Sequence, residues 1–362
     1  MKILFIAPLP PPVTGHSLAS EIFLDHLAKK HEVDVVNLSK DSLENGVSSV
    51  ARIGQIFGVF KSVLAKEKSA DAIYFTISES IAGNVKDIII YLICSGSLHK
   101  MAIHLHGGSI KKLIFDRHRL LFRINRYFIR RLGCVIVLGS SHIETFTDII
   151  PRDKIHIVPN CAADELCIEA TRLLEKYDHV PPLRILFLSN LIRGKGHEEL
   201  LEAFMALDDT LKDQVNINFA GSFESEEQEK EFLELTHGHR QVRYHGIVQG
   251  TEKKNLLFRS HVLCLPTSLF EGQPMCILEA YASGCVVVTT NQGGIRDIFQ
   301  DGINGFEVQQ KSAASIKRAI EKILGNPNQL LSLAETNRQV ADAKYRASIY
   351  NESLGNIIET IR

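Results

Sequence analysis

The chain has 362 residues, of which 45% are hydrophobic and 23% charged, and its formal net charge is −1. This composition is typical of a globular protein, and the length predicts about two domains of ~180 residues each. No apolar run approaches the ~18 residues that a membrane-spanning helix needs, which argues against a membrane-spanning protein. The near-neutral charge and the lack of a recognition motif argue against a nucleic-acid partner.

The predicted elements alternate between apolar, β-branched runs and helical patterns, which is typical of parallel α/β sheets. In the first half, the predicted strands are 2–7, 32–37, 72–76, 101–105, 134–138 and 154–158. In the second half, they are 184–188, 216–220, 242–245, 262–265, 285–289 and 305–308. Each half therefore predicts its own Rossmann-like, doubly wound sheet, whose ligands would sit beyond the carboxyl ends of the strands.

The same pattern predicts the domain boundaries. An N-terminal domain spans 1–163 and a C-terminal domain spans 183–342. The polar segment 164–182, which ends in two prolines, is predicted as the linker, with a short helix over 168–177. A final helix is predicted over 343–362. Two such domains facing each other would create a deep cleft, with one ligand held mainly by each domain.

The N-terminus and the cysteines indicate the compartment. Residues 1–7 read as a buried strand rather than a signal peptide, because a proline run follows where an apolar region should continue. Seven cysteines, an odd number without a C-x-x-C pair, argue against a disulfide framework or a zinc site. We therefore expect a cytoplasmic protein.

Two histidines end the fourth predicted strand. His104 and His106 lie two positions apart, so their side chains should share one face. His106 precedes Gly107 and Gly108 at the end of the strand, where functional residues gather, although a histidine on a strand can also be purely structural. The pair could begin a metal site, but the sequence shows no nearby third ligand and no Asp-x-Asp, so no metal is predicted.

A basic amphipathic stretch follows at 111–131, with eight Lys or Arg residues, one acid and many apolar side chains. Such a stretch can lie on an anionic membrane surface, at about 1 kcal/mol for each cation near the surface. Alternatively, its apolar side packs on its own sheet and its cations face water. The charge is also uneven along the chain: residues 1–163 carry 20 Lys or Arg against 14 Asp or Glu, whereas residues 164–362 carry 21 against 28.

A second candidate follows the first strand of the second half. Arg193 and Lys195, with Gly194 and Gly196 beside them, stand between that strand and an amphipathic helix. Cationic side chains in this position can neutralise a diphosphate. The alternative is a solvated turn before the helix.

The densest pattern is Phe270-Glu271-Gly272-Gln273-Pro274-Met275-Cys276-Ile277-Leu278-Glu279-Ala280. Pro274 suits the first turn of a helix, and Gly284 would close that helix. The amides of Gln273, Met275 and Cys276 would then form an anion site, which Gly272 would let a ligand approach. Glu271 and Glu279 would flank this site and bind hydroxyl groups. A sugar joined to a phosphate fits such a pocket, whereas the plainer interpretation is that the two glutamates only cap and solvate the helix.

This segment resembles the E-x7-E motif of the family 4 retaining glycosyltransferases, which have the GT-B fold. The resemblance continues through 282–284, Gly293-Gly294 and 301–305. It implies an α/β fold with two Rossmann-like domains, a nucleotide-diphosphate sugar as donor substrate, no cofactor and no metal. It also implies that the C-terminal helix returns to the first domain.

The resemblance implies a role for individual residues. Lys195-Gly196 is similar to the family's Lys-Gly element, while Ser189-Asn190 replace its usual Gly-Arg, so Arg193 is the nearest substitute. His106 matches the family's histidine that approaches the donor sugar. The base would lie near Ile247, and Glu279 would bind the ribose. Only Gly15 of the family's Gly-Gly loop is present, because His16 takes the second position; His16 could contact donor or acceptor, or lie on a surface loop.

The implied activity is a retaining, metal-independent glycosyl transfer, with Glu271, His106 and Lys195 as catalytic residues. The basic first half suits a lipid-linked glycan acceptor at the inner face of a membrane, as in bacterial surface polysaccharide synthesis. Two other functions stay open. One is a nucleotide-sugar 2-epimerase, which would need an acid and a base; the other is a non-catalytic subunit that binds a nucleotide sugar.

Overall fold

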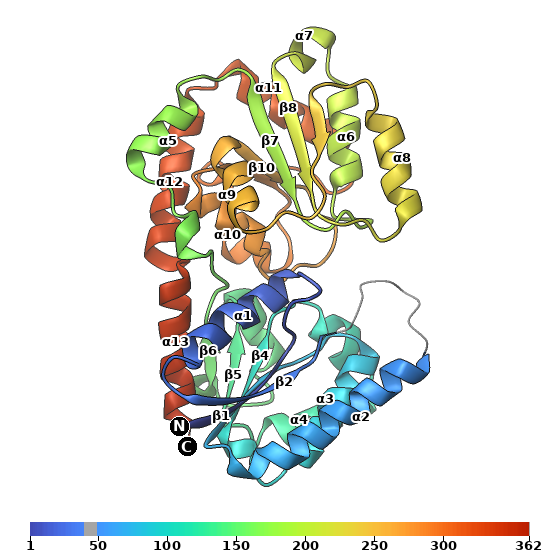
Figure 1. Cartoon of the computed structure of the whole chain (residues 1–362), viewed down its shortest axis with the longest axis vertical. Helices are drawn as coiled ribbons and strands as arrows, with labels where there is room; N and C mark the ends of the chain where they lie inside the picture. The colour runs from blue at the N-terminus through green and yellow to red at the C-terminus, as the bar shows by residue number, and fades with distance from the viewer. Residues whose placement is uncertain (40–48, 362) are drawn as a thin grey trace. The chain divides into compact units, whose positions relative to one another are not determined.

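The computed structural model describes residues 1–39 and 49–361, which divide into two compact units (Figure 1). Unit 1 comprises Met1–Asn160, Glu271–Gln273 and Ala347–Arg362, and unit 2 comprises Cys161–Phe270 and Pro274–Arg346. The segment 164–182, predicted as the linker, lies in unit 2. Its helix packs there because the Tyr177 hydroxyl donates to the carbonyl oxygens of His261 and Gly284, at 2.8 and 2.9 Å.

Unit 1 is built on a six-stranded parallel sheet in the order β2-β1-β3-β4-β5-β6. Its strands are β1 (Lys2–Ala7), β2 (Glu32–Asn37), β3 (Ala72–Thr76), β4 (Met101–Leu105), β5 (Cys134–Val137) and β6 (Ile155–Ile157). Its helices are α1 (Gly15–Leu27), α2 (Ser49–Lys66), α3 (Ile81–Ile93), α4 (Arg119–Ile129) and α13 (Ala347–Thr360), with a π-helical turn at Lys111–Phe115. The direction of the strand order changes between β1 and β3, where such a sheet offers a ligand crevice.

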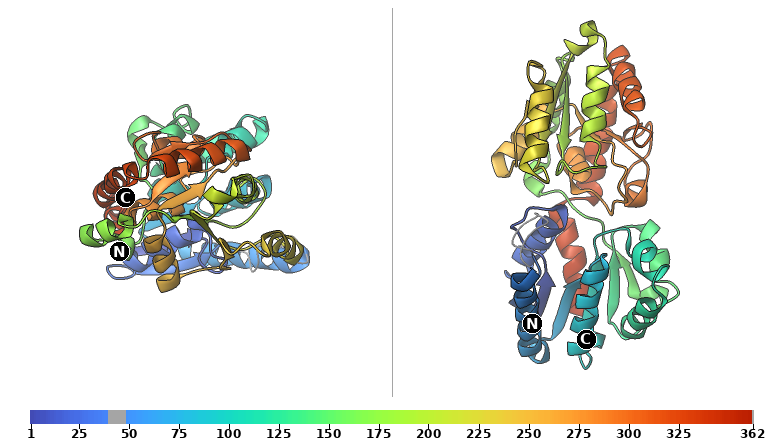
Figure 2. Two further views of the ribbon diagram at one scale, coloured as in Figure 1. Left: turned by 90° about the horizontal axis from the view of Figure 1, so that it is seen from above. Right: turned by 90° about the vertical axis from the view of Figure 1, so that its right-hand side faces the viewer.

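Helices cover both faces of this sheet because alternate residues of each strand point to opposite sides (Figures 1 and 2). Leu4 and Ile6 belong to a core that also includes apolar residues of α2, α3 and α4. On the other face, the rings of Phe5 and Tyr74 lie 6.2 and 5.1 Å from that of Phe23 in α1. Tyr350 of α13 lies 6.3 Å from the same Phe23 ring. The final helix, α13, therefore contributes a side chain to the core of unit 1.

Unit 2 repeats this architecture in the order β12-β11-β10-β7-β8-β9. Its strands are β7 (Leu183–Leu188), β8 (Val215–Ala220), β9 (Val242–Tyr244), β10 (Val262–Leu265), β11 (Val286–Thr289) and β12 (Gly305–Glu307). Its helices are α5 (Ala170–Tyr177), α6 (His197–Met205), α7 (Asp209–Lys212), α8 (Glu226–Thr236), α9 (Gly250–Arg259), α10 (Met275–Ala282), α11 (Ala313–Gly325) and α12 (Gln329–Lys344). The direction changes between β7 and β10.

Short 3₁₀ turns complete the described chain at Glu67–Ser69, Leu98–Lys100, Ser140–Thr145, Arg152–Lys154, Asp164–Leu166 and Gly293–Asp297. The predicted fold class is confirmed: all twelve predicted strands form, in two doubly wound parallel sheets, with their ends shifted by at most a residue. The helix predicted over 343–362 is instead α12 and α13, with a break at Tyr345 and Arg346. No helix of the described residues is long and apolar enough to cross a membrane.

Candidate functional site

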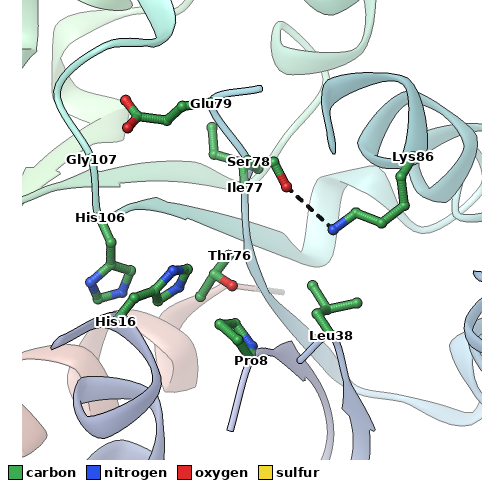
Figure 3. Close-up of a pocket in the computed structure, with 10 residues that line it drawn as sticks. All are labelled: Pro8, His16, Leu38, Thr76, Ile77, Ser78, Glu79, Lys86, His106 and Gly107. Atoms are coloured by element: carbon green, nitrogen blue, oxygen red, sulfur yellow. Dashed lines mark hydrogen bonds between the residues drawn. The ribbon is translucent and has the colours of Figure 1, made fainter. Parts of the chain in front are cut away.

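In unit 1, the candidate site is a cavity of about 360 Å³ at the carboxyl ends of the strands (Figure 3). It lies where the strand order changes direction, so loops from β1, β3 and β4 meet there. Ten residues line it: Pro8, His16, Leu38, Thr76, Ile77, Ser78, Glu79, Lys86, His106 and Gly107. The strand-end rule thus brings together two of the predicted residues, His16 and His106.

Three histidine rings stack beside this cavity. The His106 ring centroid lies 4.3 Å from that of His16 and 4.0 Å from that of His104. His104 is fully buried, and its Nδ1 lies 2.8 Å from the Tyr74 hydroxyl. The prediction that His104 and His106 share a face is therefore confirmed, and His16 lies in the first turn of α1 rather than on a loop.

These histidines are held neutral by their surroundings. Burial lowers the pKa of His16 from 6.5 to about 4, and the charge of Lys86 adds to this effect. Burial also lowers the pKa of His106 well below its usual value, with further contributions from His104 and His16. The side chain of Asn160 favours the charged form of His106 and so opposes the effect of burial in part. His106 is therefore a buried, neutral ring.

Gly15 is the first residue of α1, and the start of this helix is capped by Thr14. The Thr14 hydroxyl accepts from the Ser17 amide at 3.0 Å, and the Ser17 hydroxyl accepts from the Thr14 amide at 2.9 Å. This reciprocal pair takes up one of the amides that a Gly-Gly loop would offer to a phosphate.

Glu79 and Lys86 are two charged residues of the cavity that the sequence reasoning missed. Glu79 Oε1 accepts from the amides of Ser109 and Ile110, the latter at 3.0 Å. Burial raises the pKa of Glu79, and the nearby carboxylate of Glu271 raises it further. Glu79 follows the predicted strand 72–76, so the carboxyl-end rule could have found it, whereas Lys86 lies within α3.

The segment Glu271–Gln273 packs in unit 1, although the sequence places it inside 183–342. The reason is the Gln273 side chain, whose Nε2 donates to the Leu138 carbonyl at 2.8 Å. The Asn160 amide donates to Gln273 Oε1 at 3.2 Å, and Asn160 Nδ2 donates to the Gln273 carbonyl at 2.9 Å. A Cβ on Gly272 would stand 2.2 Å from the His106 carbonyl oxygen, so only glycine fits there. Gly272 thus lets the segment approach the His106 strand end.

In unit 2, the loop from Asn190 to Gly196 joins β7 to α6. Gly194 and Gly196 adopt left-handed conformations, with φ of 87° and 96°. A Cβ on Gly196 would stand 2.5 Å from Pro266, so this close approach requires glycine. The Ser268 amide donates to the Gly194 carbonyl at 2.7 Å, which ties the loop to the segment after β10. Lys195 is half-buried in this loop, and Arg193 is exposed.

The helix predicted after Pro274 is α10, which follows β10, the sheet neighbour of β7. Pro274 is the residue before the helix, with ψ of 118°, rather than the first residue within it. Gly284 follows the helix with φ of 63°, as predicted. The start of α10, with Met275 and Cys276, and the Lys195 loop thus stand on the two strands where the order changes direction.

Glu279 points into the body of unit 2 and is only 4% exposed. Its Oε1 lies 2.5 Å from Lys253 Nζ of α9, and this ion pair was not foreseen from the sequence. No local pattern indicates this pair, because 26 residues separate the partners and α9 shows no motif.

Ile247 follows β9 at the edge of the sheet and is 60% exposed. The Gly221 amide donates to the Gly246 carbonyl at 2.8 Å, so the loops after β8 and β9 lie side by side. The predicted site residues divide between the two units. Unit 2 contains Arg193, Lys195, Ile247, Pro274, Met275, Cys276 and Glu279. Unit 1 contains Gly15, His16, His106, Glu271, Gly272 and Gln273. Within residues 1–39 and 49–361, no group of three or more His, Cys, Asp or Glu could hold a metal ion.

Known proteins resemble this chain in sequence and in fold. Residues 171–340 match the family model described as "Glycosyl transferases group 1". The crystal structure of Anabaena Alr3699/HepE in complex with UDP-glucose superposes with a TM-score of 0.74 at 16% identity, covering 99% of this chain and 100% of that one. The two doubly wound sheets thus have the GT-B fold.

Sequence relatives of this chain carry glycosyltransferase names. An uncharacterized glycosyltransferase of Haemophilus influenzae is 22% identical over 280 residues, which are 74% of this chain and 76% of the relative. The capsular polysaccharide biosynthesis glycosyltransferase CapM of Staphylococcus aureus is 25% identical over 197 residues, 53% of this chain and 50% of the relative. Residues 171–340 thus resemble the group 1 glycosyl transferases, and the whole chain has the GT-B fold.

Proposed function

We propose that this protein is a retaining glycosyltransferase that moves a sugar from a nucleotide-diphosphate donor to a glycan acceptor. The observation that carries this proposal is the placement of the Lys195 loop and the start of α10 on β7 and β10, inside the group 1 domain. A cation and a helix start at this point of an α/β sheet together suit a diphosphate. The HepE structure, which holds UDP-glucose, supports a nucleotide sugar as the donor.

Unit 2 would bind the donor nucleotide. Lys195 and Arg193 would neutralise the diphosphate, together with the amides of Met275 and Cys276, so that no metal ion is needed for this task. Glu279 would accept hydrogen bonds from the ribose hydroxyls, and the ion pair with Lys253 would fix the position of its carboxylate. The backbone near Ile247 would contact the base.

Unit 1 would act on the sugar. Glu271 would hold the donor-sugar hydroxyls and stabilise positive character on the ring, while the neutral His106 would orient that sugar. The diphosphate leaves as the bond to the anomeric carbon breaks, and one of its oxygens takes the proton of the attacking acceptor hydroxyl on the same face. Configuration is then retained, and the protein contributes positioning and charge stabilisation rather than a nucleophile.

We further propose that the acceptor is lipid-linked and that unit 1 rests on an anionic membrane surface. All eight cations of 111–131 are exposed, together with Leu113, Leu120 and Tyr127, while Ile114, Phe128 and Ile129 pack inside. The CapM relative supports surface polysaccharide synthesis as the setting. In a flotation assay with anionic liposomes at low salt, the protein should float with the lipid; failure to float would remove the membrane proposal.

A panel of UDP-, GDP- and ADP-linked hexoses tests the function as a whole. A true donor should raise the melting temperature, because a ligand that binds the folded state stabilises it. Incubation with that donor alone, and then with a lipid-linked acceptor, distinguishes the alternatives. Transfer only in the presence of acceptor supports the proposal, conversion of the donor sugar alone indicates an epimerase, and binding without reaction indicates a binding subunit.

Two further measurements test the mechanism. NMR of the product should show the anomeric configuration of the donor, whereas an inverted product would refute the same-face reaction. Activity should survive treatment with EDTA, whereas loss of activity that Mg²⁺ or Mn²⁺ restores would refute metal independence.

A further inference from the structure

Unit 2 contains an apolar cavity between α6 and α8, which are neighbours in Figure 1. Its volume is about 310 Å³. The ring centroids of His197 in α6 and Phe232 in α8 lie 6.4 Å apart, where the two helices meet. The apolar lining comes from both helices and from the loops after β7 and β8, and consists of Leu191, Leu201, Met205, Phe223, Phe232 and Leu235. We call this cavity the α6–α8 groove.

Three exposed glutamates also line this groove and form what we call the acidic rim: Glu198, Glu202 and Glu231. None of them forms an ion pair with another residue of 1–39 or 49–361. Arg193 is the only Lys or Arg among the described residues of the lining. Burial lowers the pKa of His197 from 6.5 to about 4, so its ring is neutral. The groove is therefore apolar with a net negative charge, and it repels a phosphate or an anionic lipid.

In unit 1, α4 has a surface of the opposite character, which we call the basic face of α4. Leu120 and Tyr127 are 71% and 56% exposed and lie on one side of the helix, because seven residues are close to two turns. Arg119, Arg123 and Arg126 recur every three or four residues, so they run along one edge of that apolar pair. All three are exposed, and none forms an ion pair with a described residue. Since α4 contains no Asp or Glu, its cations are uncompensated.

The two surfaces are chemically complementary. An amphipathic helix binds a groove by inserting apolar side chains that lie one or two turns apart, which is the spacing of Leu120 and Tyr127. Arginine can form two parallel hydrogen bonds to a carboxylate, so the arginines of α4 suit the acidic rim. The wider charge distribution favours the same contact: residues 1–163 carry 20 basic against 14 acidic residues, and residues 164–362 carry 21 against 28. Such opposite charges steer the first half of one copy towards the second half of another.

We propose that the α6–α8 groove of one molecule binds the basic face of α4 of a second copy. Leu120 and Tyr127 enter the groove, and the arginines of α4 pair with the acidic rim. Because the two surfaces differ, the contact is head-to-tail and produces a ring or an open chain of copies. The proposal does not depend on the transferase activity. An anionic membrane would occupy the same face of α4, so self-association and membrane binding exclude each other.

The test measures the self-association of the full chain by sedimentation velocity, from low to high micromolar protein. At about 50 mM NaCl the weight-average sedimentation coefficient should rise with protein concentration, and at about 500 mM it should return to the value of the monomer, because salt screens charges near the surface. A protein that stays monomeric at every concentration in low salt would overturn the proposal.

Charge reversal on each side identifies the two surfaces. E202K/E231K changes the acidic rim, and R119E/R123E changes the basic face of α4. Each variant alone should lose about tenfold or more in association constant, because it places like charges opposite each other. An equimolar mixture of the two should associate again, since the first variant keeps a native α4 and the second keeps a native groove. Self-association of E202K/E231K at the wild-type level, or no association in the mixture, would refute the head-to-tail contact.

The variant E252K/E335K is the matched control, because both carboxylates are exposed on unit 2 and neither lines the groove. It should self-associate as the wild type does. A loss as large as that of E202K/E231K would show an effect of net charge and would refute the groove.

Liposome flotation at low salt keeps this proposal apart from the membrane proposal. E202K/E231K should float with anionic liposomes as the wild type does, because it leaves α4 unchanged, whereas R119E/R123E should not float. If the wild type self-associates without floating, the membrane proposal fails and the groove proposal stands. If anionic liposomes leave the self-association of the wild type intact while the protein floats, the shared use of α4 is refuted.

Discussion

Lys195 is presented by two glycines whose left-handed backbones few other residues adopt. Because its charge would act on the leaving diphosphate, K195A should lower kcat/KM by about 100-fold, the usual loss when one preorganised stabilising group is removed. The melting temperature should change little, since the side chain is only half-buried. Steady-state kinetics with the identified donor measure this effect.

K230A is the matched control for K195A, because Lys230 makes only an exposed ion pair with Glu234 on α8. Such pairs contribute little to stability, so this variant should behave as the wild type. Near-normal turnover by K195A would contradict the role assigned to Lys195.

Variants of the Lys253–Glu279 ion pair distinguish the effect of Glu279 on stability from its effect on nucleotide binding. K253M leaves the buried Glu279 carboxylate without its cation, which should lower the free energy of unfolding by about 3 kcal/mol. The double variant K253M/E279L should recover most of that loss, because it removes the unpaired charge. Denaturant titration measures both changes.

The double variant also tests the ribose contact. If Glu279 binds the ribose, nucleotide affinity measured by calorimetry should stay low in K253M/E279L even though stability returns. Recovery of affinity together with stability would show that Glu279 has only a structural role.

At the scale of elements, Gln273 anchors the segment that carries Glu271. Q273L would leave the Leu138 carbonyl and the Asn160 amide without their partner, at a cost of about 1–3 kcal/mol for each buried group. Turnover should fall at least tenfold, because a shift of about 1 Å in a catalytic group can cost 100-fold. Nucleotide affinity should change less than turnover.

Q309L serves as the control, since Gln309 is exposed. A Q273L enzyme with unchanged kcat would show that Glu271 does not depend on this anchor. A parallel loss of kcat and nucleotide affinity would show that the Gln273 side chain also supports nucleotide binding.

The sequence predicted strands and helices better than it predicted contacts between residues far apart in the chain. The β-branched runs predicted every strand of both sheets, because parallel strands buried on both faces need continuous apolar residues. The helix that starts after Pro274 followed from local rules as well. By contrast, the Lys253–Glu279 pair and the Gln273 anchor join residues that are far apart in the chain. Such contacts depend on tertiary packing, which leaves no local pattern.

Residues that belong to a recognisable motif were easier to predict from the sequence than residues that simply follow a strand. Glu79 and Lys86 stand after a correctly predicted strand, yet no motif marks them. The rule that ligands gather at the carboxyl ends of strands would have found Glu79, whereas the place of Lys86 in α3 and its ion pair with Asp87 needed the structure.

At the scale of the whole molecule, each unit contains a fully buried histidine that stays neutral. Burial lowers the pKa of His104 in unit 1 and of His261 in unit 2 from 6.5 to about 3. Below pH 6.5 the unfolded chain takes up these protons while the folded chain does not. The free energy of unfolding should therefore fall as the pH drops from 6.5 towards 3, by about 1.4 kcal/mol per pH unit for each histidine.

Glu79 and Asp87 have raised pKa values and act in the opposite direction, so variants isolate each histidine. H104Q and H261Q should each reduce the pH dependence of unfolding, as followed by denaturant titrations between pH 7.5 and 5, while His16, His106 and His197, whose pKa values burial also lowers, keep the remainder. An unchanged slope in both variants would show that these rings do not govern the acid sensitivity.

The discontinuity of unit 1 has a consequence for biosynthesis. Its core includes Tyr350 of α13, and His31 contacts Glu359 at 3.0 Å, yet α13 follows all of unit 2 in the chain. A ribosome releases unit 2 in full before unit 1 can close its hydrophobic interior. The half of the protein that is translated first is thus the half that matures last, and in the interval its exposed aromatic face is open to chaperones.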